Sequence, residues 1–109
     1  ALSRRPQKNV GHVFSYEDLS LDTIAFEVKR GKKSIPLSSK EFSLLEFLLR
    51  NVGKTVSKEK IMMHVWNYDA DILPNTIEVY IGYLRNKIDK PFKKKLIHTL
   101  RGFGYKLGG

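Results

Sequence analysis

The sequence contains no cysteine among its 109 residues. Disulfide bonds and thiolate metal centres are therefore excluded, and a reducing compartment suits the chain. Long hydrophobic runs are also missing, since no apolar stretch approaches the roughly 20 residues that a membrane-spanning helix needs. Residues 1–8 lack the apolar segment of a secretory signal peptide. We therefore expect a cytoplasmic protein with no membrane-spanning segment.

Residue patterns that support catalysis or metal binding are missing as well. The histidines are scattered and show no metal-ligand spacing, at His12, His64 and His98. No glycine-rich phosphate loop follows a predicted strand. The carboxylates fall at predicted helix starts or on helix faces, where capping and solvation explain them, at Glu41, Glu46 and Glu59. The sequence thus predicts no enzyme, no catalytic residue, no metal site and no cofactor.

Acidic residues are outnumbered in this chain. It carries 20 Lys and Arg against 11 Asp and Glu, which gives a net charge of +9. Such an excess favours a polyanionic partner, either nucleic acid or an anionic membrane surface, and charge that only keeps the protein soluble is the alternative. The length and the 41% hydrophobic content fit one compact domain with one core.

The N-terminal part is predicted to be a tail followed by a small sheet. Residues 1–11 are polar and basic and are broken by Pro6 and Gly11, which predicts a linker ahead of a domain at 12–109. Because the first residue is Ala rather than Met, we expect a piece of a longer chain. Short β-rich segments separated by polar residues then predict antiparallel strands at 13–16, 19–21, 24–28 and 34–37.

Two helices are predicted next. Ser38 and Glu41 have the spacing of a capping box, ahead of an apolar helical pattern that extends to Val52, and Gly53 suits the helix end. Ser57 caps a second, shorter helix. The apolar side of that helix is formed by Ile61, Met62, Val65 and Trp66.

A third helix and a hairpin complete the predicted domain. A polar, acidic loop at 67–73 leads to Pro74, which fits the first turn of a helix. The helix carries one apolar stripe, formed by Ile77, Ile81, Leu84 and Ile88. Strands at 96–100 and 105–107, joined by a glycine-rich turn, then predict a C-terminal hairpin.

The face of the third helix opposite its apolar stripe is polar, aromatic and cationic. At about 100° per residue this face holds Asn75, Val79, Gly82, Tyr83, Asn86 and Lys90, and its flanks hold Thr76, Glu78, Tyr80, Arg85 and Lys87. A helix of this kind fits the major groove of DNA, where such side chains read base edges and methyl groups. Arg85, Lys87 and Lys90 would reach phosphates from the sides. An ordinary solvated helix face explains the same pattern equally well.

Gly82 and the residues after this helix add support to the hypothesis of DNA binding. A glycine inside a helix costs about 1 kcal/mol relative to alanine, a cost that close approach of a DNA backbone or tight internal packing would offset. From Arg85 to Lys106 there are eight cationic residues and a single acid, Asp89. Lys93–Lys95 are expected in a solvated loop near phosphate. Arg101, at the hairpin tip, is expected to enter the minor groove, unless it is a plain turn residue.

Four segments of the chain, in order and in register, carry a resemblance to a known family. They are Leu37–Leu45, Val56–Ile61 with His64–Trp66, Thr76–Ile81 with Leu84–Arg85, and Ile97–Tyr105. They resemble the OmpR/PhoB family of winged-helix response regulators over roughly Phe14 to Leu107. The resemblance implies an α+β winged helix-turn-helix fold, with a four-stranded antiparallel N-terminal sheet, three helices and a C-terminal β-hairpin wing. It also implies sequence-specific binding of double-stranded DNA to control transcription, with the third helix in the major groove and the wing in the minor groove.

The resemblance also bears on individual residues. Arg85, Thr99, Arg101 and Tyr105 match positions that contact DNA in the family, although Tyr105 suits the core equally well. Family members often carry cations where this chain has Asn75, Gly82 and Tyr83, so base readout is expected to differ. The expected contacts on the helix are Asn75, Thr76, Val79, Tyr80, Tyr83, Arg85, Asn86, Lys87 and Lys90, and those on the wing and basic loop are Lys93, Lys94, Lys95, Thr99, Arg101 and Tyr105.

Several partners follow from the resemblance. The domain would be a monomer alone and a head-to-tail dimer on direct-repeat promoter sites. An N-terminal receiver domain, absent from this chain, would connect it to a sensor histidine kinase. The loop after the second helix, with Tyr68, Asp69 and Asp71, would meet RNA polymerase.

Two other classes of function are alternatives to DNA binding. An RNA-binding module should expose stacking aromatics on a sheet, but most aromatics here fall at core-like positions. A winged helix that binds only proteins would keep the apolar stripe without the cationic wing.

Overall fold

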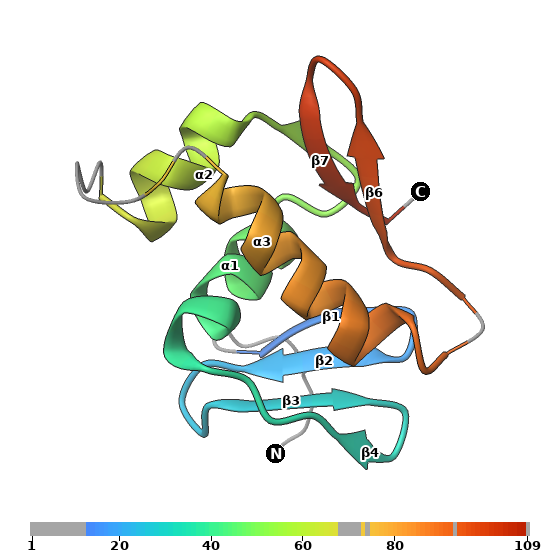
Figure 1. Cartoon of the computed structure of the whole chain (residues 1–109). Coiled ribbons are helices and arrows are strands. Elements are labelled where there is room, and N and C mark those ends of the chain that lie inside the picture. Colours follow the sequence, from blue (N-terminus) through green and yellow to red (C-terminus); the bar gives the residue numbers. More distant parts are fainter. Residues whose placement is uncertain (1–12, 68–72, 74, 93, 109) are drawn as a thin grey trace, which may run out of the picture.

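The computed structural model describes residues 13–67, 73, 75–92 and 94–108. The predicted tail at 1–11 lies outside these residues, as do His12, Pro74 and Lys93. The N-terminal sheet is antiparallel in the order β1-β2-β3-β4 (Figure 1). Its strands are β1 (Val13–Tyr16), β2 (Leu19–Asp22), β3 (Glu27–Arg30) and β4 (Lys33–Ser34).

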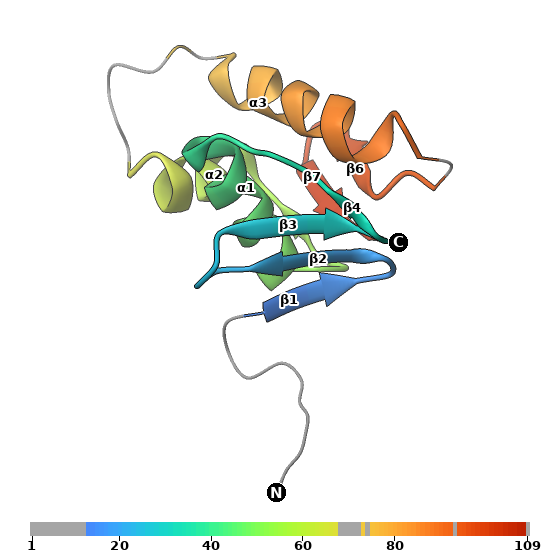
Figure 2. The same cartoon turned by 90° about the horizontal axis from the view of Figure 1, so that it is seen from below.

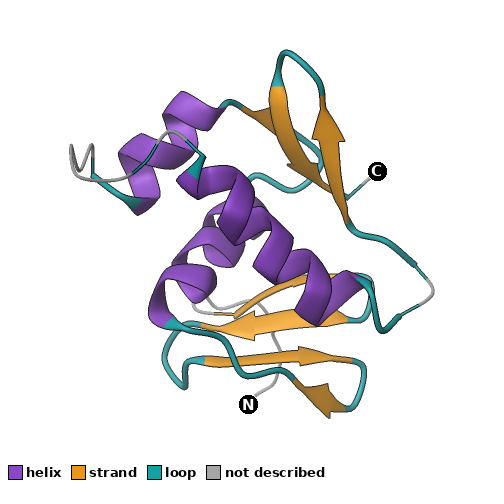
Figure 3. Cartoon of the chain, in the orientation of Figure 1, coloured by secondary structure: helices purple, strands orange, loops and turns teal. Residues whose placement is uncertain are grey.

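Helices cover one face of this sheet (Figure 2). They are α1 (Ser39–Arg50), α2 (Lys58–Val65) and α3 (Thr76–Leu84), and α3 continues into a π-helical segment, η1 (Arg85–Asp89). A second, three-stranded sheet stands apart from the first (Figure 3). It has the order β5-β7-β6, from β5 (Thr55–Val56), β6 (Ile97–Leu100) and β7 (Gly104–Leu107). The expected α+β winged-helix architecture is confirmed.

One apolar core joins the helices to both sheets. The predicted stripe of the third helix is confirmed, because Ile77, Ile81, Leu84 and Ile88 are each 2% exposed or less. These side chains share the core cluster with Leu44, Leu45 and Leu48 of α1 and with Leu19 and Leu21 of β2. Since the stripe is buried, the opposite face of α3 is turned outward.

The predicted helix starts are confirmed in atomic detail. The Ser38 hydroxyl accepts the Glu41 N–H at 3.3 Å, and the Glu41 carboxylate accepts the Ser38 N–H at 2.8 Å, which is a complete capping box. The Ser57 hydroxyl accepts the Lys60 N–H at 3.1 Å at the start of α2. The predicted end of the first helix was too late, since α1 stops at Arg50 and leaves Val52 outside it.

Two strand predictions were wrong in their bounds by more than one residue. The strand expected at 24–28 begins only at Glu27, because the Asp22 carboxylate accepts the N–H groups of Ile24 and Ala25 and closes a turn. Phe26 has a positive φ of 54° in this turn and is 75% exposed. The last strand, expected at 34–37, is only the two residues of β4.

Strand β5 was not expected from the sequence. It pairs with β7, so that Val56 lies opposite Tyr105 and the wing is held by a third strand. Gly104 makes this pairing possible, because a Cβ at this position would lie 2.0 Å from the Val56 carbonyl oxygen. The β6–β7 hairpin with its turn at 101–103 is the wing. Through β5, the sheet fixes the base of this wing against the segment between α1 and α2.

Candidate DNA interface

The outward face of α3 is exposed as predicted. Val79 and Tyr83 are 38% and 46% exposed, and Asn75, Asn86 and Lys90 are exposed as well. Thr76, on the flank, is half-buried. The face thus presents amide, aromatic, aliphatic and ammonium groups together, the chemistry that reads base edges and thymine methyl groups.

Tyr80 is held within an aromatic cluster. Its ring meets those of Trp66 and Tyr83 edge-on, with centroids 5.3 Å and 5.4 Å apart. Tyr80 is half-buried, whereas Tyr83 is the more exposed ring. Both tyrosines were predicted to touch bases. Tyr80 packs α3 against Trp66 at the end of α2, and Tyr83 is the one available to a ligand.

Gly82 lies on open surface. A Cβ added there would meet nothing within 4 Å, so internal packing does not explain the glycine. It borders a groove of about 610 Å³ between the end of the helix and β6, which is also lined by Asn86, Lys90, His98 and Thr99. Of the two explanations drawn from the sequence, tight internal packing is excluded, which leaves approach by an outside molecule.

Arg85 and Thr99, two predicted contact residues, are brought together. The Arg85 guanidinium donates to the Thr99 hydroxyl and lies 3.5 Å from the Ile97 carbonyl oxygen. These bonds join the start of η1 to β6. The end of α3 and the wing are therefore oriented relative to each other by the same side chains that were predicted to meet DNA.

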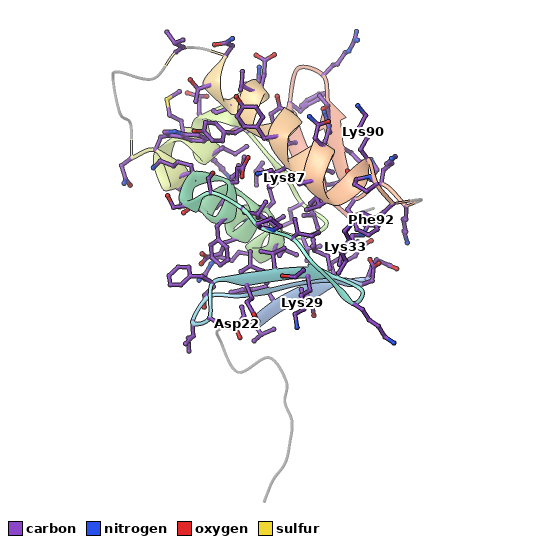
Figure 4. All side chains as sticks on the ribbon, turned by 60° about the horizontal axis from the view of Figure 1, so that its bottom comes forward. Asp22, Lys29, Lys33, Lys87, Lys90 and Phe92 are labelled. Atoms are coloured by element: carbon purple, nitrogen blue, oxygen red, sulfur yellow. The ribbon has the colours of Figure 1, made fainter. Side chains whose placement is uncertain are left out.

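Lys87 has a partner inside the protein. Its ammonium nitrogen lies 2.7 Å from an oxygen of the Glu41 carboxylate, which is buried. Burial alone would raise the pKa of Glu41, but the hydrogen bond from Lys87 and the cap at Ser38 hold it below its ordinary value. Figure 4 shows Lys87 on the α1 side and Lys90 farther along the helix. Lys90 is thus the better placed of the two for a phosphate.

Lys94 and Lys95 of the predicted basic loop also make contacts within the protein. Lys94 pairs with Glu17 at 3.2 Å on the surface. The Lys95 ammonium donates to the carbonyl oxygens of Asp89 and Phe92 at 3.0 Å and 3.3 Å, which satisfies carbonyls at the helix end. Both lysines remain exposed, so their charges still contribute to the field at this end of the helix.

A buried arginine joins η1 to the loop that follows it, and sequence reasoning missed this residue. Arg30 of β3 is 3% exposed. Its guanidinium donates to the carbonyl oxygens of Ile88 and Lys94 and lies 4.6 Å from the centre of the Phe92 ring. It also pairs with Asp18 at 3.0 Å. One side chain of the N-terminal sheet therefore positions the η1 segment that continues α3.

Asp89 completes this arrangement. Its carboxylate lies 3.5 Å from the Arg30 guanidinium and accepts the N–H groups of Leu96 and Ile97, each at 3.0 Å. Asp89 is 3% exposed and links the end of η1 to the start of β6. The sequence did contain a signal for it, since Asp89 is the single acid in an otherwise cationic stretch.

The wing tip lies beside the N-terminal ends of α2 and α3. A groove of about 570 Å³ runs between them, lined by Lys58, Glu78, Thr99, Arg101 and Phe103 among others. Arg101 is exposed, as predicted. Tyr105 is 4% exposed and burial raises the pKa of its hydroxyl, so the core packing that the sequence allowed for it is confirmed.

Within residues 13–67, 73, 75–92 and 94–108, no helix is long and apolar enough to cross a membrane. In the same described part, no group of three or more His, Asp or Glu side chains is arranged to hold a metal ion. The predicted polymerase-contact residues Tyr68, Asp69 and Asp71 lie outside the described residues.

The chain matches the family model described as the C-terminal part of transcriptional regulatory proteins, over residues 31–107. The chain belongs to this family. It is an output domain of the OmpR/PhoB type, and the family is one of transcriptional regulators rather than of enzymes.

Relatives of this family agree in sequence and in fold. The response regulator MprA of Mycolicibacterium vanbaalenii is 42% identical over 111 residues, which cover 98% of this chain and 48% of MprA. The structure of DrrB from Thermotoga maritima, an OmpR/PhoB homologue, has a TM-score of 0.77 and 33% identity, covering 90% of this chain and 45% of DrrB. The DNA-binding domain of CpxR from E. coli has a TM-score of 0.77 and 26% identity, covering 89% of this chain and 96% of that domain. The chain thus spans about half the length of the curated relatives it matches.

Proposed function

We propose that the domain binds double-stranded promoter DNA sequence-specifically, with α3 in the major groove and the wing in the adjacent minor groove. One observation carries the proposal: the open face of α3 and the wing strand β6 line one groove, and the flank of α3 and the wing tip line a second, so a single duplex can meet helix and wing together. Gly82 adds support, because open space surrounds it on the outward face. Val79, Tyr83 and Asn86 are the residues we propose for base contacts.

The cationic side chains on this surface suggest a separate role for each in contacting DNA. Lys90 and Arg101 are exposed, and we propose that they bind phosphates and the minor groove respectively. Lys94 and Lys95 would strengthen binding to all sequences by a similar factor, since their contact with the duplex would be with phosphate. Arg85 and Thr99 would set the angle between helix and wing and contact DNA from that position.

The test is selection of bound fragments from a random duplex pool at moderate salt. Enrichment of one motif supports the proposal, and binding that only fades with salt and enriches nothing contradicts it. A preference for structured RNA over duplex DNA would instead favour the RNA-binding alternative.

A pair of lysine variants makes the test specific to this surface. Lys90→Ala should weaken binding and reduce the salt slope by about 1. Lys29→Ala removes the same charge from β3 of the N-terminal sheet, away from α3 (Figure 4), and should leave the slope unchanged. Equal losses for both variants would show that only net charge matters.

Further proposals concern the longer protein to which the family points. Residues 1–11 would be the linker from a receiver domain, with 12–109 as the output domain. A sensor histidine kinase would act through that receiver in the cytoplasm, and two copies would bind direct repeats head to tail. Half-sites about one helical turn apart in the selected DNA would support this pairing.

The loop at 67–73 is proposed to contact RNA polymerase. Replacing Asp69 and Asp71 with asparagine should spare DNA binding and reduce transcription in vitro. Unchanged transcription from a template that the variant still occupies would contradict this role.

A further inference from the structure

Phe103 is an exposed aromatic residue at the tip of the wing. It is 74% exposed and lies between Gly102 and Gly104 in the turn that joins β6 to β7. Its N–H donates to the Leu100 carbonyl oxygen at 2.9 Å, and Gly102 has a positive φ of 81°. The backbone of the turn therefore holds the phenyl ring outward at the end of a thin hairpin.

Within the described part of the chain, the Phe103 ring has no aromatic partner and is not among the side chains packed on the core. The comparison with Phe26 is direct, since that ring is 75% exposed but lies 5.3 Å from the ring of Phe42. Packing on Phe42 thus explains the position of the Phe26 ring, and no such contact explains the position of the Phe103 ring within the described part of the chain. An apolar ring in this position is suited to contact with another molecule.

The surroundings of Phe103 indicate which molecule. Arg101, two residues away in the same turn, is exposed and cationic, and both line the groove that runs along the wing toward Lys58. That groove is continuous with the DNA interface proposed above, because Thr99 lines it as well as the groove beside Gly82. A narrow, cationic tip with one apolar side chain fits the minor groove, where phenylalanine can contact sugars and wedge between base steps.

We propose that Phe103 is a DNA-contact residue that inserts into the minor groove beside Arg101 and packs on the deoxyribose walls and a base step. The inference rests on the proposed function and adds to it a contact that carries no charge. A wedge works best at steps that unstack easily, so the wing should prefer a pyrimidine–purine step such as TA beneath Phe103. Guanine at this step should disfavour insertion, because its amino group projects into the minor groove.

The first experiment compares Phe103→Ala with the matched control Phe26→Ala on a duplex obtained by selection. We expect Phe103→Ala to weaken binding by roughly 5- to 150-fold, the range that loss of one aromatic contact with a base implies. The salt slope should not change, since no cation is lost. Phe26→Ala should bind as the parent does. Thermal melting of Phe103→Ala should match the parent, because the ring is exposed.

Two further measurements locate the contact. With 2-aminopurine at the step under the wing, fluorescence should rise on binding of the parent and not of Phe103→Ala. A second duplex carries guanine at this step and should bind the parent more weakly. Replacing that guanine by inosine, which removes the amino group, should restore the affinity of the parent and have less effect on the affinity of Phe103→Ala.

The outcomes separate this inference from the proposed function. If Phe103→Ala binds as tightly as the parent while Lys90→Ala still loses affinity, the Phe103 contact is refuted and the interface stands. If Phe103→Ala weakens binding only on a duplex with two half-sites, the ring meets a second copy of the chain and the minor-groove contact is refuted. If no sequence is selected and no variant changes a salt-dependent, non-specific affinity, the proposed function itself fails.

Discussion

Replacing Gly82 with alanine should move stability and DNA affinity in opposite directions. Gly82 lies inside the continuous helix formed by α3 and η1, its φ is not in the left-handed region, and a Cβ there would meet nothing within 4 Å. Alanine in a helix interior is favoured over glycine by about 0.8–1.0 kcal/mol. No clash subtracts from this gain, so we expect a stabilisation of about 1 kcal/mol.

This gain is large enough to measure. For a domain of this size, about 1 kcal/mol corresponds to a rise in Tm of roughly 4–8 °C. If a DNA backbone packs against Gly82, the added methyl group overfills that contact, at a cost of about 1–3 kcal/mol. The Kd should therefore increase by roughly 5- to 150-fold. The assays are thermal unfolding and anisotropy titration with the selected duplex.

A control separates helix propensity from the contact. Ser43→Ala, at an exposed position within α1, also raises helix propensity and should stabilise the domain slightly with no effect on DNA binding. A Gly82→Ala variant that melts below the parent would refute the open-space argument. A more stable variant that binds DNA as before would show that no backbone approaches this point.

Three more substitutions test the core and its charges. Leu84→Ala should destabilise the domain by about 2–5 kcal/mol in urea unfolding because it empties a fully buried position, and an unchanged midpoint would mean that the stripe is not in the core. Arg30→Met should cost about 3–5 kcal/mol by leaving the buried Asp89 carboxylate without its cation, and a neutral result would show that apolar packing replaces the pair. The depressed pKa of Glu41 stabilises the fold above its ordinary value of 4.5, and that contribution is lost as pH falls through the lowered pKa. Lys87→Met should raise this pKa in an NMR titration and cost stability at neutral pH but not in strong acid, and an unmoved pKa would contradict the pairing.

Local patterns in the sequence predicted the helices well. The capping box at Ser38 and Glu41 and the cap at Ser57 depend on residues within one turn, and both are present. The stripe from Ile77 to Ile88 depends only on helical periodicity, and it is buried. These features could be derived because the physical cause and its effect lie close together in the chain.

Features that depend on distant residues could not be derived in this way. Arg30 bonds to carbonyl groups 58 and 64 residues later, and a basic residue at the end of a short strand gives no sign of that. The two-residue β5 pairs with β7 about fifty residues away and is too short to show any alternation. The same limit applied to the candidate DNA interface. The pairing of Lys87 with Glu41 could not be predicted, because it joins η1 to the distant helix α1.

The π-helical segment was also beyond sequence reasoning. The Lys90 N–H donates to the Arg85 carbonyl oxygen at 2.7 Å, five residues back, where the apolar stripe predicted an ordinary helix. Ile88 is buried in either geometry, so periodicity does not distinguish them. The extra residue in this turn is accompanied by the bonds that Asp89 makes to β6.

The pairing of β5 with β7 has a consequence for the order of events on DNA. The β6–β7 hairpin is local in sequence, but it docks on a two-residue strand that is in place only once α1 and α2 have assembled. We therefore expect the wing to dock last in folding and to detach first in the native state, with amide hydrogens of β5 and β7 exchanging before those of α3. A wing that lifts while the helices stay intact would let α3 settle on a duplex first and the hairpin tip close on it afterwards.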